Sequence, residues 1–326
     1  MMKNLVTTGL LKHENMVKIL ITGGAGFIPS CLAEKLAENP ENFIVIVDNF
    51  ITGSKSKIPK SIHNNIKFIK ADCNDFKDIS GVFYSFQFDY VFHYAALVGV
   101  QRTLDNPVQV LNDITGLKNI LGLCKNSGVK RVFYSSSSEV YGEPVEFPQN
   151  EHTTPLNSRL PYAIVKNVGE AFLKSYKQEY GLDYTVFRFF NTYGPKQSKD
   201  FVVSKFIYKA LKNKPITVYG DGLQTRTFCY IDDNIEATTN AFYKNMYIND
   251  VVNIGGEVEI TILELAQTII KLTKSESKIQ HLAALEDGDM TRRRPDIKKM
   301  KKLLNRPMLP LEEGMQKVLN QLDWII

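Results

Sequence analysis

The sequence has little of what marks secreted, metal-binding or membrane proteins. Its four cysteines stand far apart and form no C-x-x-C pair, which excludes a compact disulfide framework and favours reduced thiols. The five histidines show no metal-ligand spacing. No apolar run reaches the roughly 18 residues of a membrane-spanning helix, and the first residues show no signal-peptide core. We therefore expect a cytoplasmic protein with no metal site and no membrane partner.

Charge of one sign is also scarce. Lys and Arg number 40 against 35 Asp and Glu, a surplus of only +5 in 326 residues, and the hydrophobic share of 44% is typical of a globular chain. This length allows one large α/β unit or two ordinary domains. A positive surplus suits binding to nucleic acid, to an anionic membrane surface or to a phosphate-bearing small molecule. Where the basic residues lie in the chain has to decide among these three partners.

The basic residues are densest near the end of the chain, where seven lie between Thr291 and Lys302. Nucleic-acid binding would explain such a run, but no helix-turn-helix, zinc-finger or RNA-binding signature accompanies it. A phosphate-binding loop followed by a solvated helix explains it better. Nucleic acid is therefore not an expected partner.

Strand-like and helix-like segments alternate through the first two thirds of the chain. Apolar runs predict strands at 17–21, 43–47, 66–69, 90–94, 131–135 and 184–189. Helix patterns are expected at 28–36, from Val110 through Leu121 to a stop at Ser127-Gly128, and from Pro161 to Tyr180. This alternation predicts right-handed βαβ units and a parallel sheet whose strands are buried on both faces.

The expected fold class is α/β, a Rossmann-type doubly wound parallel sheet with a smaller C-terminal α/β substrate lobe. Residues 1–15 are expected to be an N-terminal extension. The dinucleotide-binding domain is expected at 16–190, completed by about 228–256, and the substrate lobe at 191–227 and 257–326. The lobe is less regular in sequence, with more turn residues and fewer clean strands.

A glycine-rich turn, Gly23 to Pro29, lies directly between the first strand and the first helix. Glycines there let the backbone approach a pyrophosphate, whose charge meets the amide groups of the helix N-terminus. Asp48 ends the second strand, where a carboxylate binds a ribose 2′-hydroxyl and repels a 2′-phosphate, which favours NAD over NADP. Pro29 replaces the usual third glycine and is tolerated in the first turn of a helix.

Tyr162 and Lys166 are four residues apart and share one face of the predicted helix. The ammonium group stabilises a phenolate, which can take a proton from a substrate hydroxyl as hydride leaves the same carbon. An ordinary amphipathic helix is the alternative for this pair alone. The serine-rich segment Ser135 to Gly142 leaves a strand at the carboxyl edge of the sheet, where ligands bind. Within it, Glu139 is either a second acid–base group or a solvated turn residue.

Together these motifs resemble the extended short-chain dehydrogenase/reductases, specifically the NAD-dependent nucleotide-sugar epimerase/dehydratase family. The matching stretches run in family order from about residue 16 to the end of the chain: Thr22 to Ile28, Val47 to Asn49, Ala71-Asp72, His93 to Ala96, Ser135 to Gly142, Pro161 to Lys166, Phe190 to Pro195, Val218 to Gly222 with Gln224 to Arg226, and Arg293 to Asp296.

The resemblance implies a role for each matching residue. For NAD it implies Gly23, Gly26, Phe27 and Ile28 at the pyrophosphate, Asp48 at the adenosine ribose, Asp72 and Cys73 at the adenine, and Asn49, Ala95, Ala96, Tyr162 and Lys166 also in the cofactor set. The implied catalytic residues are Ser137, Tyr162 and Lys166, with Glu139 as a further acid–base candidate. For a sugar nucleotide it implies Ser137, Ser138, Asn191, Arg226 and Arg293, the arginines meeting the diphosphate. It also implies a homodimer built from the helices at 110–121 and from Pro161.

The implied chemistry is oxidation at C4 of a nucleotide-linked sugar to a 4-keto intermediate, and members of the family differ in the fate of that intermediate. The 4,6-dehydratases carry an Asp-Glu pair after the catalytic hydroxyl residue; Ser138-Glu139 stands here, which disfavours dehydration. Decarboxylases carry a Thr-Ser-Glu stretch and an Arg-x-Pro tail, which Ser137 to Glu139 and Arg293 to Pro295 resemble.

The segment Asn157 to Lys166 looks more like that of the epimerases. A 4-epimerase of surface-glycan or capsule precursor synthesis is therefore the favoured reaction. The alternatives are a decarboxylase, a net C4 dehydrogenase that releases the keto sugar, and a catalytically silent NAD-sensing protein.

Overall fold

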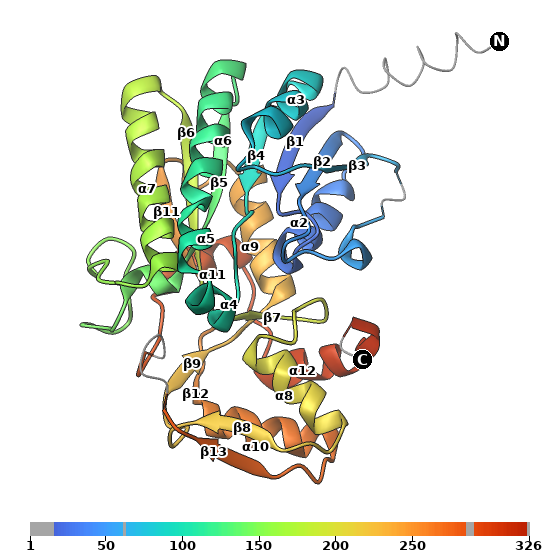
Figure 1. Ribbon diagram of the computed structural model, residues 1–326, viewed down its shortest axis with the longest axis vertical. Coiled ribbons are helices and arrows are strands. Elements are labelled where there is room, and N and C mark those ends of the chain that lie inside the picture. The colour runs from blue at the N-terminus through green and yellow to red at the C-terminus, as the bar shows by residue number, and fades with distance from the viewer. Residues whose placement is uncertain (1–15, 61–62, 285–289, 325–326) are drawn as a thin grey trace, which may run out of the picture. The chain divides into compact units, whose positions relative to one another are not determined.

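The computed structural model describes residues 16–60, 63–284 and 290–324 (Figure 1). The predicted extension 1–15 lies outside these residues. The contacts within the chain group it into two compact units. The first comprises the chain up to Ala96, Asn112–Tyr134 and Ala171–Thr185; the second comprises Leu97–Leu111, Ser135–Glu170 and the chain from Val186 onward. The domain boundaries expected from the sequence stay predictions.

A seven-stranded sheet has the order β11-β6-β5-β4-β1-β2-β3. Its strands are β1 Val17–Thr22, β2 Asn42–Asp48, β3 Ile66–Lys70, β4 Tyr90–His93, β5 Arg131–Ser137, β6 Asp183–Phe189 and β11 Asp250–Ile254. The pairs from β3 through β2, β1 and β4 to β5 are parallel. The predicted Rossmann-type parallel sheet is thereby confirmed, and all six predicted strands are present.

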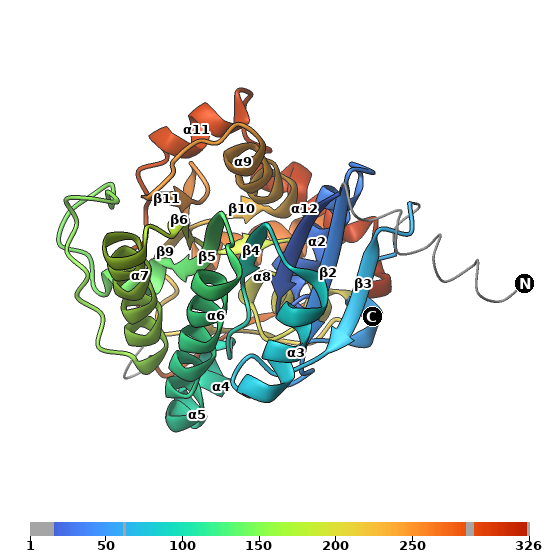
Figure 2. The ribbon, with the colours of Figure 1, turned by 90° about the horizontal axis from the view of Figure 1, so that it is seen from above.

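The first unit shows how the sheet is wound. Its helices are α2 Phe27–Ala37, α3 Phe76–Phe86 and α6 Asp113–Ser127. From β1 the chain moves to β2 and β3 on one side, then returns past β1 to β4 and β5 on the other. Right-handed crossovers therefore place α2 on one face of the sheet and α3 and α6 on the other. The contacts agree, since α2 packs on β2 while α3 and α6 pack together (Figure 2).

The interior of this unit is as apolar as the sequence predicts. Every residue of β2 is buried, and Ile19, Leu20 and Ile21 of β1 are fully buried. The rings of Phe92 on β4 and Phe133 on β5 stack with their centroids 4.3 Å apart. Strands covered on both faces need apolar side chains in both directions, which explains the continuous apolar runs.

The helix expected from Val110 needs a correction, and one helix of the first unit, α3, was not predicted. The single helix expected from Val110 is two helices, because α5 Pro107–Leu111 ends before Asn112, whose carbonyl accepts from Thr115 N–H in a tightened turn at 2.9 Å. Helix α3 was not predicted from the sequence. It begins at Asp75, whose carboxylate accepts hydrogen bonds from Lys77 N–H at 2.8 Å and Asp78 N–H at 3.4 Å.

The second unit is built of shorter elements. It contains two-stranded pairs β7–β10, β9–β12 and β8–β13, with β7 Thr192–Tyr193, β8 Ile216–Tyr219, β9 Thr225–Thr227, β10 Cys229–Tyr230, β12 Glu259–Thr261 and β13 Ile279–Leu282. Its helices are α4 Val100–Asp105, α5, α8 Val202–Leu211, α9 Ile231–Tyr243, α10 Ile262–Thr273, α11 Lys298–Leu304 and α12 Leu311–Leu319. Helix α7 Pro161–Tyr180 has the predicted bounds and belongs to both units.

No helix in the described part of the chain combines the length and apolarity needed to cross a bilayer.

The turn after β1 depends on a glycine. Gly23 has φ +71°, and a Cβ built on it would lie 2.9 Å from Ala95 Cα. The order of the strands reverses between β1 and β4, and this close approach joins the carboxyl ends of these two strands.

We expect Gly23→Ala to lower the free energy of unfolding by about 1–3 kcal/mol, because the substitution adds both a clash and a strained φ. Equilibrium urea unfolding measures it. Gly81→Ala is the matched control: Gly81 lies within α3 with nothing within 4 Å of an added Cβ, and alanine there should stabilise the helix by about 0.5–1 kcal/mol. Equal stability of the two variants would show that the Gly23 turn is not strained.

Candidate functional site

In the first unit, the predicted phosphate turn is tightly folded. Gly24 N–H donates to Val47 O at 3.0 Å and Gly26 N–H to Gly23 O at 2.8 Å. A Cβ on Gly26 would also lie 2.9 Å from Gly23 O, so the backbone is compact at Gly23 and Gly26. A pyrophosphate placed at this turn could approach the main chain without meeting a side chain.

Helix α2 begins directly at this turn, with Gly26 as its N-cap. The first turn of a helix has N–H groups without partners inside the helix, and these attract anions. Pro29 is the third residue of α2, ahead of the first helical bond, which Ser30 N–H donates to Gly26 O at 3.4 Å. The proline therefore removes an N–H that has no acceptor within the helix. Phe27 and Ile28 retain theirs.

Asp48 is buried and bound to the same turn. Its Oδ2 accepts from Ala25 N–H at 3.0 Å and its Oδ1 from Phe50 N–H at 2.7 Å. Burial raises the pKa of Asp48 above its ordinary value, and the two amide bonds and Lys57 offset only part of this rise. A carboxylate has about four acceptor positions, so these two bonds leave capacity for a ribose hydroxyl.

The remaining cofactor candidates of this unit lie near the ends of β2, β3 and β4. Asn49 Nδ2 donates to Asp72 Oδ2 at 3.0 Å, which joins the loops after β2 and β3. Cys73 is buried, and burial raises the pKa of its thiol, so it stays protonated. Ala95 N–H donates to Thr22 Oγ1 at 3.0 Å, and Ala96 follows it.

The sequence did not identify Thr22 as an organising residue. Its hydroxyl oxygen accepts from both Tyr94 N–H and Ala95 N–H at 3.0 Å, and it is also hydrogen-bonded to His93 Nδ1 at 2.9 Å. Thr22 thus holds the end of β4 against the end of β1.

In the second unit, helix α7 carries Tyr162 and Lys166 on one face. Lys166 is only 2% exposed, and its Nζ lies 5.7 Å from the centre of the Tyr162 ring. The same Nζ donates to Ser135 Oγ at 3.3 Å. A buried ammonium this close to a phenol favours the phenolate, which is the electrostatic condition for a tyrosine base.

The serine-rich segment is an ordered end of a strand. Strand β5 continues to Ser137, two residues beyond its predicted end, and the short 3₁₀ helix η2 Ser138–Tyr141 comes immediately after it. Ser137 caps η2 by accepting from Glu139 N–H at 3.2 Å, and both Ser137 and Ser138 are buried.

Glu139 forms an ion pair with Arg293, with 2.7 Å between Glu139 Oε1 and Arg293 Nη1. Their side chains are 17% and 7% exposed, so the interpretation of Glu139 as a solvated turn residue is wrong. Glu139 Oε2 is buried and has no hydrogen-bond partner within the described residues. Arg293 Nε also lies 3.1 Å from Met290 Sδ. The sequence named both charged residues but did not predict that they pair.

The other substrate candidates are also held in place. Arg226 is 6% exposed and its Nη1 donates to Thr225 O at 2.8 Å, so it is not a solvated surface charge. Asn191 has φ +27°, and its Nδ2 donates to Thr227 O at 3.1 Å. Both residues lie in or beside the short strands of the second unit.

The basic run near the C-terminus is largely neutralised by carboxylates. Besides the pair of Arg293, Arg292 pairs with Glu259, Lys299 with Asp250 and Lys301 with Glu257. Most of the positive charge in this run is thus offset by carboxylates of the same chain, so it does not indicate an extended anionic partner.

Comparison with known proteins agrees with these motifs. Residues 19–255 match the model of the NAD dependent epimerase/dehydratase family. The chain is 39% identical to UDP-glucuronic acid decarboxylase 1 of Danio rerio over 95% of this chain and 73% of that protein. It is 37% identical to a putative UDP-glucose 4-epimerase of Methanocaldococcus jannaschii over 93% of this chain and 97% of that protein.

Among solved structures, the UDP-glucose 4-epimerase of Thermotoga maritima with UDP-glucose superposes with a TM-score of 0.86 at 31% identity, covering 93% of this chain and 98% of that one. The chain therefore belongs to the NAD-dependent epimerase/dehydratase family and is an enzyme that uses NAD as its cofactor.

Proposed function

We propose that the protein is a decarboxylase of a nucleotide-linked uronic acid, most simply a UDP-linked one. The observation that carries this proposal is the largely buried Glu139–Arg293 pair, two residues beyond Ser137, in which one carboxylate oxygen is buried and unpartnered among the described residues. The similarity to the decarboxylase of Danio rerio supports it. Oxidation at C4 alone needs no such pair.

The first step needs only the groups foreseen from the sequence. Tyr162, beside the Lys166 ammonium group, would take the proton of the C4 hydroxyl, and Ser137 would hold the same oxygen. NAD, when bound, supplies the acceptor for the hydride of C4 and the donor that later reduces the product. We assign Gly23, Gly26, Phe27, Ile28 and Asp48 to its binding.

A ketone at C4 makes the C6 carboxylate of a uronic acid a β-keto acid. The C5–C6 bond then breaks, its electron pair passes to C5 and the C4 oxygen as an enolate, and C6 leaves as carbon dioxide. Tyr162 and Ser137 would stabilise the enolate oxygen. C5 next takes a proton, and Glu139 is the acid that we assign to this step.

Arg293 gives this assignment a second reason. A planar guanidinium group suits a carboxylate or a phosphate, so Arg293 could hold either the uronate or the diphosphate. When a substrate anion takes over part of Arg293, Glu139 Oε1 is released from the ion pair and becomes available to a reacting atom.

A 4-epimerase is the second candidate. The segment from Asn157 to Lys166 and the likeness to the Thermotoga maritima epimerase favour it. Epimerisation leaves C5 and C6 untouched, so it gives Glu139 no chemical task. Decarboxylation and epimerisation therefore differ in whether they require Glu139 as an acid.

A panel of nucleotide sugars and nucleotide uronic acids tests the proposal by product mass. We expect the purified protein to release carbon dioxide from a nucleotide uronic acid, and its product to have lost that mass. A neutral sugar nucleotide converted to an isomer of unchanged mass, with every uronic acid inert, would establish the epimerase instead.

Glu139→Gln should slow product formation about 100-fold, because a general acid contributes at least that factor, while C4 oxidation followed by NADH absorbance in a single turnover falls much less. Glu143→Gln is the matched control, since Glu143 is an exposed carboxylate four residues on that binds Thr291. It should behave as the parent enzyme. Equal losses of oxidation and product formation in Glu139→Gln would remove the acid role.

Tyr162→Phe should reduce single-turnover NADH formation by about 100-fold or more, because the base for the C4 hydroxyl is lost while the ring is kept. Tyr180→Phe, at the other end of the same helix and half exposed, should leave the rate unchanged. Unchanged NADH formation in Tyr162→Phe would contradict the assigned mechanism.

NAD affinity should depend on pH through Asp48. The ribose hydroxyl donates to an ionised carboxylate, so binding should be strong above the pKa of Asp48 and weaken as the pH falls through it. Because burial raises that pKa, the weakening should begin at a higher pH than an ordinary carboxyl, of pKa about 3.9, would give. Calorimetric titration with NAD across this range measures the effect. Asp48→Asn should bind NAD more weakly and without the acid limb; retention of the limb would assign it to another group.

A further inference from the structure

A buried ion pair in the second unit lies outside the roles assigned above. Arg188 of β6 donates from Nε to Glu170 Oε1 at 2.9 Å and from Nη2 to Glu170 Oε2 at 2.6 Å. The two side chains are 4% and 10% exposed. This is the two-pronged geometry in which a guanidinium and a carboxylate fit best. Burial alone would lower the pKa of Arg188, but the hydrogen bonds and charge of Glu170 raise it above its ordinary value, so the guanidinium stays charged.

Glu170 lies on the catalytic face of α7. Tyr162, Lys166 and Glu170 follow one another at intervals of four residues, and so project from one side of the helix. Glu170 Oε1 accepts from Ser136 Oγ at 2.5 Å, and Lys166 donates to Ser135. Two residues one turn apart on α7 therefore bind two successive serines of β5, immediately before Ser137.

Arg188 also reaches the other end of the same segment. Its Nη1 donates to Tyr141 Oη at 2.8 Å, and Tyr141 is the last residue of η2. Tyr141 Oη in turn donates to Asn253 Oδ1 at 2.8 Å. Burial raises the pKa of Tyr141 to about 12, so the phenol stays protonated and keeps this bond.

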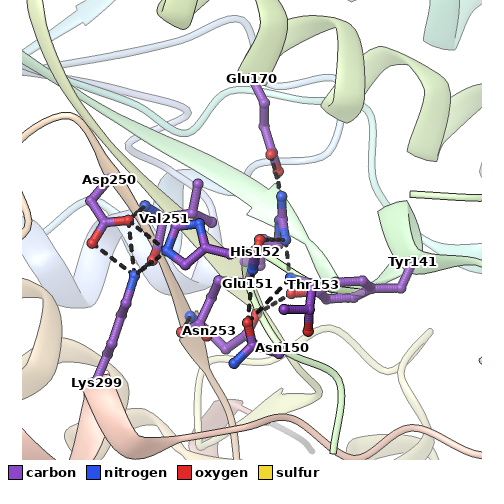
Figure 3. A network of polar contacts seen from close by, with 11 residues as sticks. Tyr141, Asn150, Glu151, His152, Thr153, Glu170, Asp250, Val251, Asn253 and Lys299 are labelled. Atoms are coloured by element: carbon purple, nitrogen blue, oxygen red, sulfur yellow. Dashed lines mark hydrogen bonds and ion pairs between the residues drawn. The ribbon is translucent and has the colours of Figure 1, made fainter. Parts of the chain in front are cut away.

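The network continues into the loop before α7. Arg188 Nη1 donates to Glu151 O at 3.1 Å, and Glu151 Oε1 accepts from Asn253 N–H at 3.0 Å. Figure 3 shows Glu170, Tyr141, Glu151 and Asn253 within one set of polar contacts. Each of the three guanidinium nitrogens of Arg188 donates to an acceptor.

We propose that Arg188 and Glu170 are positioning residues that hold the segment Ser136–Tyr141, and with it Ser137 and Glu139, in register with Tyr162 on α7. The pair binds the segment at both ends, through Ser136 and Tyr141, and binds α7 at Glu170. Ser137 and Tyr162 must meet one substrate oxygen from two separate elements. Through Ser136 and Tyr141 the ion pair ties those elements together, in addition to the bond of Lys166 to Ser135.

A pair that served stability alone would not need this placement. Buried ion pairs are often no more stabilising than apolar residues of the same size, because both ions lose their water. Misplacement of a catalytic group by about 1 Å can cost a factor of about 100 in rate. The expected benefit of the pair is therefore geometric, and its loss should appear in kcat more than in KM.

The test uses Glu170→Gln, which keeps the shape of the side chain and removes its charge. The inference rests on the proposed function for its substrate, so the parent enzyme is assayed first for NADH formation with the nucleotide-sugar panel. We expect kcat of Glu170→Gln to fall by about 10- to 100-fold with KM changed less than about threefold. Tyr141→Phe, which removes only the two bonds of Oη, should show a smaller fall in kcat.

Asp233→Asn is the matched control. Asp233 is a buried carboxylate of α9 that pairs with Arg306 at 2.8 Å and accepts from Leu309 N–H at 2.9 Å. This variant should lose thermal stability as Glu170→Gln does, yet retain the parent kcat per folded molecule. If Glu170→Gln also retained the parent kcat, the pair would be merely structural and the inference overturned.

A crystal structure of Glu170→Gln with NAD provides a readout that needs no substrate. We expect Ser137 Oγ to shift relative to Tyr162 Oη by more than about 0.5 Å, the tolerance of a catalytic constellation. Coincident positions would overturn the inference even if no substrate were found. Failure of the parent enzyme to oxidise any nucleotide sugar would instead contradict the proposed function, and the displacement of Ser137 would still decide the role of the pair.

Discussion

The burial of charged groups is the constraint on which the second unit depends. An ion taken out of water is costly unless a partner of opposite charge and further hydrogen bonds replace its hydration. Two such pairs lie on either side of Ser137, and they are satisfied to different extents. Arg188 and Glu170 are fully engaged with each other and with Ser136 and Tyr141. In the pair of Glu139 and Arg293, one carboxylate oxygen is left without a partner among the described residues.

This difference separates the proposed roles of the two pairs. A fully satisfied buried network has one low-energy arrangement and resists displacement, which suits a scaffold. A partly exposed carboxylate with an unused oxygen can instead exchange hydrogen-bond partners at smaller cost. In the first unit, side-chain oxygens fix the backbone of two loops. Asp48 accepts from the loop after β1 and Thr22 accepts from the loop after β4, and Gly23 allows these two loops to touch.

Local sequence signals predicted the elements that local interactions determine. The six strands and the limits of α7 follow from apolar runs, Pro161 and Gly181, and the structure contains them. The break at Asn112 was missed because apolar spacing continues across it. Helix α3 is not among the predicted helices, although Asp75 is a good N-cap. Thus caps and breaks, which involve single residues, were the least visible features.

The functional groups divide in the same way. The glycine turn and the Tyr162–Lys166 spacing are local patterns, so the sequence located them. Glu139 and Arg293 are 154 residues apart in the chain, and no periodicity links them. Their pairing depends on the second unit having folded, as does the contact of Arg188 with Tyr141. Sequence patterns could therefore name these charges but could not decide between solvated and paired states.

The remaining choice among reactions depends on how many acids each reaction requires at C5 and C6. Elimination of water from C5 and C6 needs an acid for the departing hydroxyl in addition to the groups that act on C5. Position 138, which is aspartate in the dehydratases, is a buried serine here, and a hydroxyl group is too weak an acid for that task. Carbon dioxide leaves without a proton, so decarboxylation requires a single acid for C5. Glu139, a largely buried carboxyl group paired with Arg293, matches the requirement of the proposed reaction, whereas epimerisation would use neither residue for its chemistry.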